Sequence, residues 1–265
     1  MMCCRRPALL SIGQMPLNER VGLEDLHDDQ EIWRFLNRRK LADLICTGSL
    51  RLTRISDLRK PEIDERESRL PSVVREMLQH VSSDESAKAF LRKMLDMCEE
   101  QAFGIFASCW FLPGMSEEER RMWAEFGGGN KGGVRINSTL QRLVSSLPTD
   151  TRRLFGVGRI RYIREDISYP EVFALGQYHS MPFLLKLEDH TYEREIRLFE
   201  RFHRPQTYWD VQEEQPPCTR FRITDGDLIE SITVSPICPN EIKQDSINQL
   251  LQWRFPKERI HTPRP

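Results

Sequence analysis

Phe103-Gly-Ile-Phe-Ala-Ser-Cys-Trp-Phe111 is the stretch that decides the fold, because it is too apolar for a strand at the protein surface. A strand covered on both faces reads as a near-continuous apolar run, whereas a half-exposed strand alternates apolar and polar residues. Pro113-Gly114 then ends the run. We therefore expect this segment to form a strand at the centre of a sheet.

Strands and helices are interspersed unevenly on both sides of this run, which is typical of an α+β domain rather than a strict βαβ array. The other expected strands are 32–36, 49–53, 132–136, 155–163, 192–198 and 228–234. The expected helices are 38–45, one or two within 71–100, 116–126, 138–146, 171–185 with a break near Met181-Pro182, and 239–251. We predict a single α+β domain over residues 29–262, with a mixed or antiparallel central sheet and flanking helices, after an irregular lead at 1–28.

The composition fits a globular protein. The chain has 265 residues, of which 39% are hydrophobic and 30% charged, and its formal net charge is -1. A chain of this length can bury a sizeable core, and its composition forces neither disorder nor nucleic-acid binding by the whole chain. No apolar segment approaches the roughly 20 residues that cross a bilayer, and the start of the chain lacks a secretory apolar region. We expect a cytoplasmic protein without a membrane partner.

Cysteine and histidine spacing argues against disulfide and metal chemistry. The seven cysteines are an odd count without a Cys-x-x-Cys pair, and the six histidines include no His-x-x-x-His pair. Disulfide frameworks and zinc sites normally show such pairing, so we assign no metal. Cys109 lies in the central apolar run, where a buried thiol is usually inert.

The glycine-rich segment Gly127-Gly-Gly-Asn-Lys-Gly-Gly133 has two readings. Glycines let backbone N–H groups approach a phosphate, but a phosphate loop follows a strand and opens a helix. Here the glycines close the expected helix 116–126 and precede the expected strand 132–136. This order favours a helix end followed by a tight turn.

Lys186-Leu-Glu-Asp-His-Thr-Tyr-Glu-Arg-Glu-Ile-Arg-Leu-Phe-Glu200 carries the candidate chemistry. Residues two apart on a strand share a face, so Glu193, Glu195 and Arg197 would form one charged row. Burying such a row of charges costs free energy, so a buried row is expected mainly where the charges have a function. Two other readings stay open, namely a solvated strand face and a helix in which Glu193 and Arg197 form an i,i+4 ion pair.

Arg34, Ser108 and several aromatic residues are the other candidates. A buried arginine is rare without an anionic partner, so Arg34 either reaches the edge of the sheet or pairs with a carboxylate or phosphate. Ser108 is most simply a strand residue, although a buried hydroxyl needs a partner. Aromatic residues such as Trp123 are most simply core, and the alternative is a slot for a nucleobase or nicotinamide ring.

Several motifs together resemble a bacterial family, domain of unknown function family twenty-nine seventy-one. The shared elements are Trp33-Arg34-Phe35, Gly48-Ser-Leu-Arg-Leu52, Ala107-Ser-Cys-Trp110, Met122-Trp123 running to Val134, Val157 to Tyr162, Lys186 with Tyr192 to Arg197, and the strand near Ile232. The resemblance covers most of residues 31–260. The His-Tyr that usually follows Met-Trp is replaced here by Glu125-Phe126, and the usual Asn-Asp-Pro-x-Glu after the second strand is degenerate.

The order of a basic residue on the first strand, Ser on a central strand and Glu-x-Glu on a late strand resembles the ADP-ribosyltransferases. This resemblance implies an ADP-ribosyltransferase-like fold with NAD as co-substrate. It implies two catalytic carboxylates, with Glu195 bound to the ribose 2′-hydroxyl and Glu193 orienting or deprotonating the incoming nucleophile. Arg34 would hold the NAD pyrophosphate, Ser108 would brace the catalytic carboxylate or the nicotinamide side, and Trp123 would pack behind the pocket.

Two functional hypotheses follow. The first is an NAD-consuming ADP-ribosyl transfer enzyme, a toxin or defence effector that modifies a nucleic-acid or protein acceptor. The second is a non-enzymatic module that binds nucleic acid or a partner protein through arginine-rich segments, which are Arg51, Arg54, Arg59 and residues 152–164. A steep loss of affinity with salt would identify the second. The sequence assigns no assembly state.

Overall fold

The structure is a computed structural model. It describes residues 19–58, 74–75, 77–79, 84–149, 155–164, 166–175, 178, 181–201, 218–223 and 227–262. Most of the expected N-terminal lead, part of the helix expected at 71–100, Arg59 and Arg152 lie outside the described residues. Inside the stretch expected to be an irregular lead, Glu19–Val21 forms a short strand, β1.

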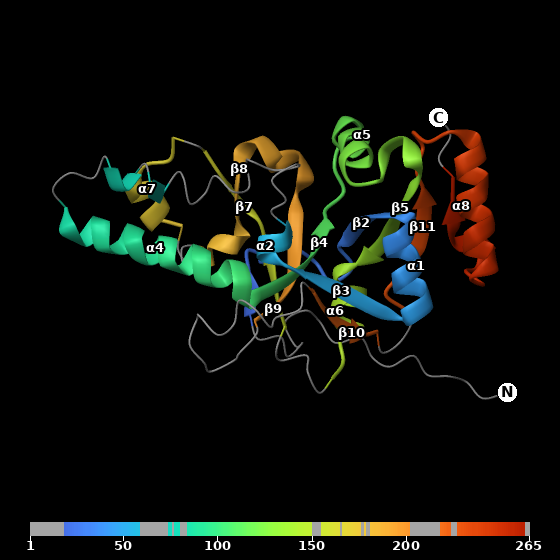
Figure 1. Ribbon diagram of the computed structural model, residues 1–265, viewed down its shortest axis with the longest axis horizontal. Helices are drawn as coiled ribbons and strands as arrows, with labels where there is room; N and C mark the ends of the chain where they lie inside the picture. Colours follow the sequence, from blue (N-terminus) through green and yellow to red (C-terminus); the bar gives the residue numbers. More distant parts are fainter. Residues whose placement is uncertain are drawn as a thin grey trace.

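The chain folds as an α+β protein around a mixed, mostly antiparallel sheet (Figure 1). The strand order is β1-β6-β9-β4-β2-β5-β11-β12, and β3 and β10 branch from β4. The bounds are β2 Glu31–Asn37, β3 Ser49–Arg54, β4 Ile105–Phe111, β5 Gly133–Thr139, β6 Phe155–Arg159, β9 Glu195–Arg201, β10 Cys218–Arg222, β11 Ser231–Val234 and β12 Ile260–His261. A separate parallel pair joins β7 Arg161–Ile163 to β8 Leu185–Leu187. The expected α+β class and sheet type are confirmed.

The central position of β4 is also confirmed, because β4 pairs along one edge with β9 and along the other with both β2 and β3. The contact with β2 is the single register pair Trp33 and Phe111. The contact with β3 is made nearer the start of β4, where Ala107 pairs with Thr53 and Phe106 pairs with Arg54. The sheet therefore divides at β4 into one branch that continues through β2 and another that continues through β3 and β10.

The helices lie on both faces and at both ends of the sheet (Figure 1). Their bounds are α1 Arg38–Thr47, α2 Ile55–Leu58, α4 Glu85–Gly104, α5 Ser116–Glu125, α6 Leu140–Ser145, α7 Tyr169–Phe173 and α8 Asn240–Gln252. Short 3-10 turns are η2 Gly129–Lys131, η5 Pro182–Leu184, η6 Glu188–Glu193 and η7 Lys257–Arg259. The helix expected at 171–185 is shorter than predicted, because α7 ends at Phe173. The 3-10 turn η5 and strand β8 follow the break expected near Met181-Pro182. None of the described helices is long and apolar enough to cross a membrane.

The two faces of the sheet carry different cores. Trp110, Ile196 and Leu198 pack on one face with apolar residues of α1, α6 and α8. The other face carries two apolar clusters, one built around Phe199 and Phe183 and one in which the strand aromatics pack against α5. Register pairs fix which strand residue joins which face, since Glu195 stands opposite Phe111 and Arg197 opposite Cys109. This register places Glu195 and Arg197 of β9 on the face covered by α5.

Candidate functional site

Glu195 begins β9 and is almost completely buried, with an exposed fraction of 1%. Its carboxylate is held by two cations. Arg197 Nε donates to Oε1 at 2.7 Å, and Lys186 Nζ lies 2.8 Å from Oε2. Arg197 also donates to the main-chain oxygen of Phe183, and the Tyr162 hydroxyl accepts the main-chain N–H of Glu195 at 2.9 Å. These contacts lock the carboxylate in one orientation.

Glu193 is not on the strand, so the expected i,i+2 row of Glu193, Glu195 and Arg197 is wrong in its geometry. Glu193 ends the 3-10 turn η6, and Arg194 between the two acids adopts a left-handed conformation with φ 47°. A strand cannot continue through such a residue. The two carboxylates nevertheless meet, because both bind Lys186.

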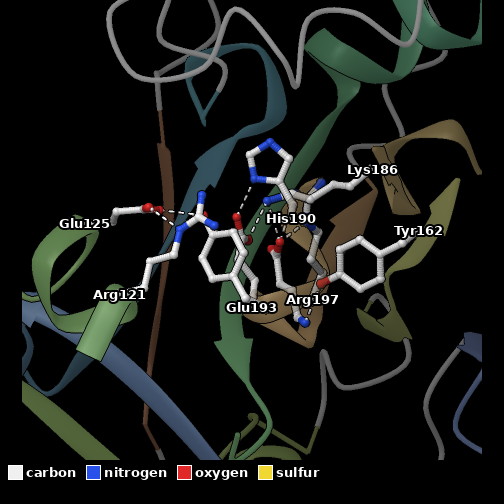
Figure 2. Close-up of polar contacts among 9 residues, drawn as sticks. Arg121, Glu125, Tyr162, Lys186, His190, Glu193 and Arg197 are labelled. Atoms are coloured by element: carbon white, nitrogen blue, oxygen red, sulfur yellow. Dashed lines mark hydrogen bonds and ion pairs between the residues drawn. The ribbon is translucent and has the colours of Figure 1, made fainter. Parts of the chain in front are cut away.

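Figure 2 shows the side chains that surround Glu193. Lys186 Nζ donates to Glu193 Oε2 at 2.7 Å, and His190 Nδ1 lies 2.8 Å from Oε1. Glu193 is buried to the same degree as Glu195, and Lys186 and His190 are buried as well. The result is a cluster of two carboxylates and two permanent cations, Lys186 and Arg197, which we call the carboxylate cluster.

The charges of the carboxylate cluster determine its protonation. Burial alone raises the pKa of Glu195, but Arg197 and Lys186, with hydrogen bonds from Arg197 and the Cys109 thiol, bring that pKa well below its usual range. Glu195 is therefore ionised at neutral pH. Burial, and next the charge of Glu195, raise the pKa of the Cys109 thiol. Cys109 consequently stays protonated, as expected of an inert thiol, and serves as a donor to Glu195.

Arg121 and Glu125 lie beside Glu193 (Figure 2). The guanidinium of Arg121 stacks over the Tyr192 ring, 3.6 Å from its centroid, and Arg121 Nε binds Glu125 at 2.8 Å. The Tyr192 hydroxyl donates to Glu125 at 2.5 Å. Arg121 and Glu125 come from α5, whereas Tyr192 directly precedes Glu193. We call this stacked and hydrogen-bonded group of Arg121, Tyr192 and Glu125 the Tyr192 cover.

Ser108 lies on the other face of the sheet. Its register partner on β9 is Leu198, and Trp110 Nε1 donates to its Oγ at 3.0 Å within the core. The buried hydroxyl therefore has the partner that it needs, but this partner is an indole and not Glu195. Cys109, one residue further along β4, occupies the position expected for Ser108.

Arg34 also leaves its strand on the face opposite Glu195, because its register partner is Ile136 whereas Trp33 is paired with Phe111. Its Nη2 donates to the main-chain oxygen of Arg51 across the division between β2 and β3, at 3.4 Å. Its guanidinium lies 5.6 Å from the centroid of the Trp110 ring. Burial lowers the pKa of Arg34 to about 10. Among the described residues no carboxylate forms an ion pair with it.

Trp123 lies on α5 and on the same face of the sheet as Glu195. Its ring packs edge-on against Phe35 with centroids 4.8 Å apart, and its Nε1 donates to Glu119 at 3.2 Å. Trp123 is 1% exposed. It belongs to the aromatic cluster against which Cys109 and Tyr192 pack. Trp123 therefore fills core space on this face, and its expected place behind an NAD pocket stays a prediction.

The partners of the two acids were harder to predict from the sequence than the acids themselves. Lys186 lies in the buried strand β8, and a lysine between two leucines there requires a carboxylate. His190 and Tyr162 carry no such signal, because each reaches the cluster from a turn or strand whose position depends on the tertiary fold. Within the described part of the chain, no group of three His, Cys, Asp or Glu side chains could hold a metal ion.

The glycine-rich segment forms a turn between α5 and β5, which confirms the structural reading of that sequence. The chain passes through η2 and then through Gly132 at φ 75°, a conformation that favours glycine. The helix precedes the glycines and the strand follows them, in the opposite order to a phosphate loop.

Comparison of this chain with protein-family models, curated proteins and solved structures gives no match.

Proposed function

We propose that this chain is an NAD-dependent enzyme of the ADP-ribosyltransferase type that modifies a nucleic acid or a protein, with the carboxylate cluster as its centre. The observation that carries the proposal is the pair Glu193 and Glu195, two buried carboxylates that share Lys186 at 2.7 and 2.8 Å. The strand order agrees with it, since the Glu195 strand lies beside β4 and β2 lies beyond.

Glycosyl transfer from NAD develops positive charge on the ribose ring, and a fixed carboxylate in a water-poor site lowers that barrier. Glu195 has the required properties, since it is ionised, buried and oriented by Arg197. Glu193 lies closer to the Tyr192 cover and would orient or deprotonate the acceptor. The bracing role first expected of Ser108 falls to Cys109, and Arg34 and Ser108 have no part in the proposed chemistry.

Substrate access under this proposal requires the Tyr192 cover to move. The Tyr192 hydroxyl and the Arg121 guanidinium are tied to the same residue, Glu125, which is itself partly exposed. Breaking these contacts would open a path to Glu193 without disturbing the core. Covers of this kind commonly gate active sites.

Glu195→Gln tests the proposal, because it keeps the size of the side chain and removes its charge. We expect NAD turnover to fall by about 10²-fold or more. Glu200→Gln is the matched control, since Glu200 lies on the same strand but on the other face, bound to Thr219 at 3.1 Å. Turnover is measured by release of nicotinamide at a temperature at which circular dichroism shows both variants folded.

Full activity of Glu195→Gln, or equal losses in the two variants, would rule out this role for Glu195. Binding is tested separately by a thermal-shift titration with NAD, because a ligand that binds only the folded state raises the melting temperature. The absence of any shift for the wild-type protein would count against NAD as co-substrate.

A second candidate function is the non-enzymatic module that binds a polyanion, and Arg34 is the observation that favours it. A partly buried guanidinium without a carboxylate among the described residues is a ready partner for a phosphate. The described part of the arginine-rich segment 152–164 contributes less than expected. Arg159 is paired with Asp25 at 2.8 Å, and Arg164 is paired with Asp166 and Glu171 at 3.3 Å each.

Arg34→Met is expected to leave the free energy of unfolding unchanged or to raise it, because the variant no longer buries a charge without a counter-ion. If the chain binds single- or double-stranded nucleic acid, the same variant should weaken that binding and reduce the salt slope by about 1. Arg220→Met, at an exposed arginine paired with Asp43 at 2.7 Å, is the control. A loss of stability with unchanged nucleic-acid affinity would make Arg34 a structural residue.

A further inference from the structure

A polar pocket of about 700 Å³ lies on the β5, β11 and β12 end of the sheet, away from the carboxylate cluster. This volume is within the range of small-molecule sites. The pocket lies on the face of the sheet that carries Trp33. On the opposite face of the same strands, Ile136 and Ile232 belong to the apolar core. The proposed function above makes no use of this pocket.

The floor of the pocket is a hydrogen-bonded row centred on Asn137. Arg135 Nε donates to Asn137 Oδ1 at 2.8 Å, and Asn137 Nδ2 donates to Ser231 Oγ at 2.7 Å and to Thr233 Oγ1 at 3.0 Å. Both hydroxyls act as acceptors in this row, so each keeps a hydrogen to donate. Asn137 and Thr233 are only 7% and 3% exposed, whereas Ser231 is partly exposed, so this row forms the floor of a pocket that is open to solvent.

The walls of the pocket carry charges of both signs. Arg259 donates through Nε to the main-chain oxygen of Glu230, and its guanidinium lies 5.3 Å from the centroid of the Phe255 ring. Glu230, Glu258 and Glu31 supply carboxylates. Among the described residues no ion pair joins Arg259 to any of these acids. Arg135, in contrast, is already engaged by Glu119 and stacks on Trp33.

These features select the chemistry of the ligand. A nucleotide would bring its negative charge against three carboxylates, whereas a purely cationic ligand would leave Arg259 and the two hydroxyl donors without acceptors. A ligand that carries both signs satisfies both sets of groups. We propose that the pocket binds a small zwitterion, namely a free amino acid or a close derivative. Its carboxylate would face Ser231, Thr233 and Arg259, and its ammonium group would face the acids of the wall.

The test uses the twenty standard amino acids as probes in thermal-shift and calorimetric titrations of the full chain. We expect one chemical group of amino acids to raise the melting temperature. The best probe is then compared with its decarboxylated amine and its deaminated acid. Each half-ligand should bind at least about tenfold more weakly, which corresponds to about 1.4 kcal/mol. A half-ligand that binds as tightly as the zwitterion, or no shift with any probe at about 10 mM, would overturn the proposal.

Two variants locate the ligand. Thr233→Val keeps the shape of the side chain and removes one hydroxyl donor, so affinity should fall by about tenfold. Thr53→Val, on β3 and away from the pocket, is the matched control. Because Thr233 also supports Asn137, Arg259→Gln serves as a second variant at a more exposed position, with the same expected loss. Unchanged affinity in both pocket variants would show that the zwitterion binds elsewhere and would refute the assignment.

Discussion

Replacing Lys186 by Met is expected to lower the free energy of unfolding by about 3–5 kcal/mol, because the variant removes the lysine that both buried carboxylates bind and leaves Glu195 with Arg197 and Glu193 with His190. Lys186 Nζ is within 2.8 Å of both acids, and both acids are almost fully buried. Methionine matches the aliphatic part of the lysine side chain, so the loss reports the charge rather than the packing. Urea unfolding followed by circular dichroism measures it.

Lys88→Met provides the control for this measurement. Lys88 pairs with Glu85 at 2.8 Å on the surface of α4, and Glu85 is largely exposed. Surface pairs of this kind contribute about 0–1 kcal/mol, so the control should unfold nearly as the wild type does. A loss below about 1 kcal/mol for Lys186→Met would mean that the carboxylate cluster does not depend on this cation.

The same cluster predicts how stability changes in acid. Burial alone raises the pKa of Glu195, but Arg197 and Lys186 bring it well below the usual range in the folded protein. The stability that Glu195 provides is therefore fully present above its unfolded pKa of about 4.3, and it is lost as the pH falls from there through the lower folded pKa. Lys186→Met brings the folded pKa closer to the unfolded one, so the variant should lose less stability between about pH 7 and pH 3. An equal loss in both proteins would contradict this assignment.

Gly133→Ala is expected to destabilise the protein by more than about 3 kcal/mol, or to prevent folding. A Cβ atom at this position would lie 2.0 Å from the main-chain oxygen of Gly127 and 2.8 Å from that of Leu36. Both atoms belong to the backbone, one in the glycine turn and one in β2, so no side-chain rotation relieves the overlap. Soluble yield and urea unfolding are the measurements.

Gly104→Ala is the matched control, because a Cβ atom at the end of α4 would meet no atom within 4 Å. Alanine there should be neutral, or stabilise by up to about 1 kcal/mol through the lower entropy of the unfolded chain. Unfolding of Gly133→Ala and Gly104→Ala at the same urea concentration would show that the turn tolerates a side chain, contrary to the geometry.

The sequence predicted the α+β class and the central strand well, because both depend on signals that are local. Residues 105–111 form an uninterrupted apolar run, and a strand with neighbours on both edges is where such a run is most stable. The glycine turn was predictable for the same reason, since glycines after a helix and before a strand mark a turn whatever the rest of the fold does.

The composition of the site was less predictable, because it depends on which face each strand residue joins. Ser108 and Cys109 are neighbours, and on a strand neighbouring residues point to opposite faces. Only the register with β9 decides that Cys109, and not Ser108, lies beside Glu195. The same alternation of faces separates Arg34 from the carboxylates, because Arg34 lies on the opposite face of the sheet. The order of motifs along the chain does not show which face each side chain joins.

Glu193 illustrates a second limit of the sequence. The spacing of Glu193 and Glu195 fits a strand, yet the left-handed backbone of Arg194 ends that pattern between them. An arginine gives no local indication of this conformation, unlike glycine or asparagine. The pair still converges because Lys186, on a different strand, attracts both acids.

The carboxylate cluster is a set of four charges that sum to zero, made of Glu193, Glu195, Lys186 and Arg197. Seen from outside it contributes nothing to the net charge, but any single loss would leave a bare charge in the interior. Related chains can therefore lose this cluster only if an acid and a base are replaced together. Substitutions at these four positions should consequently be correlated among related chains.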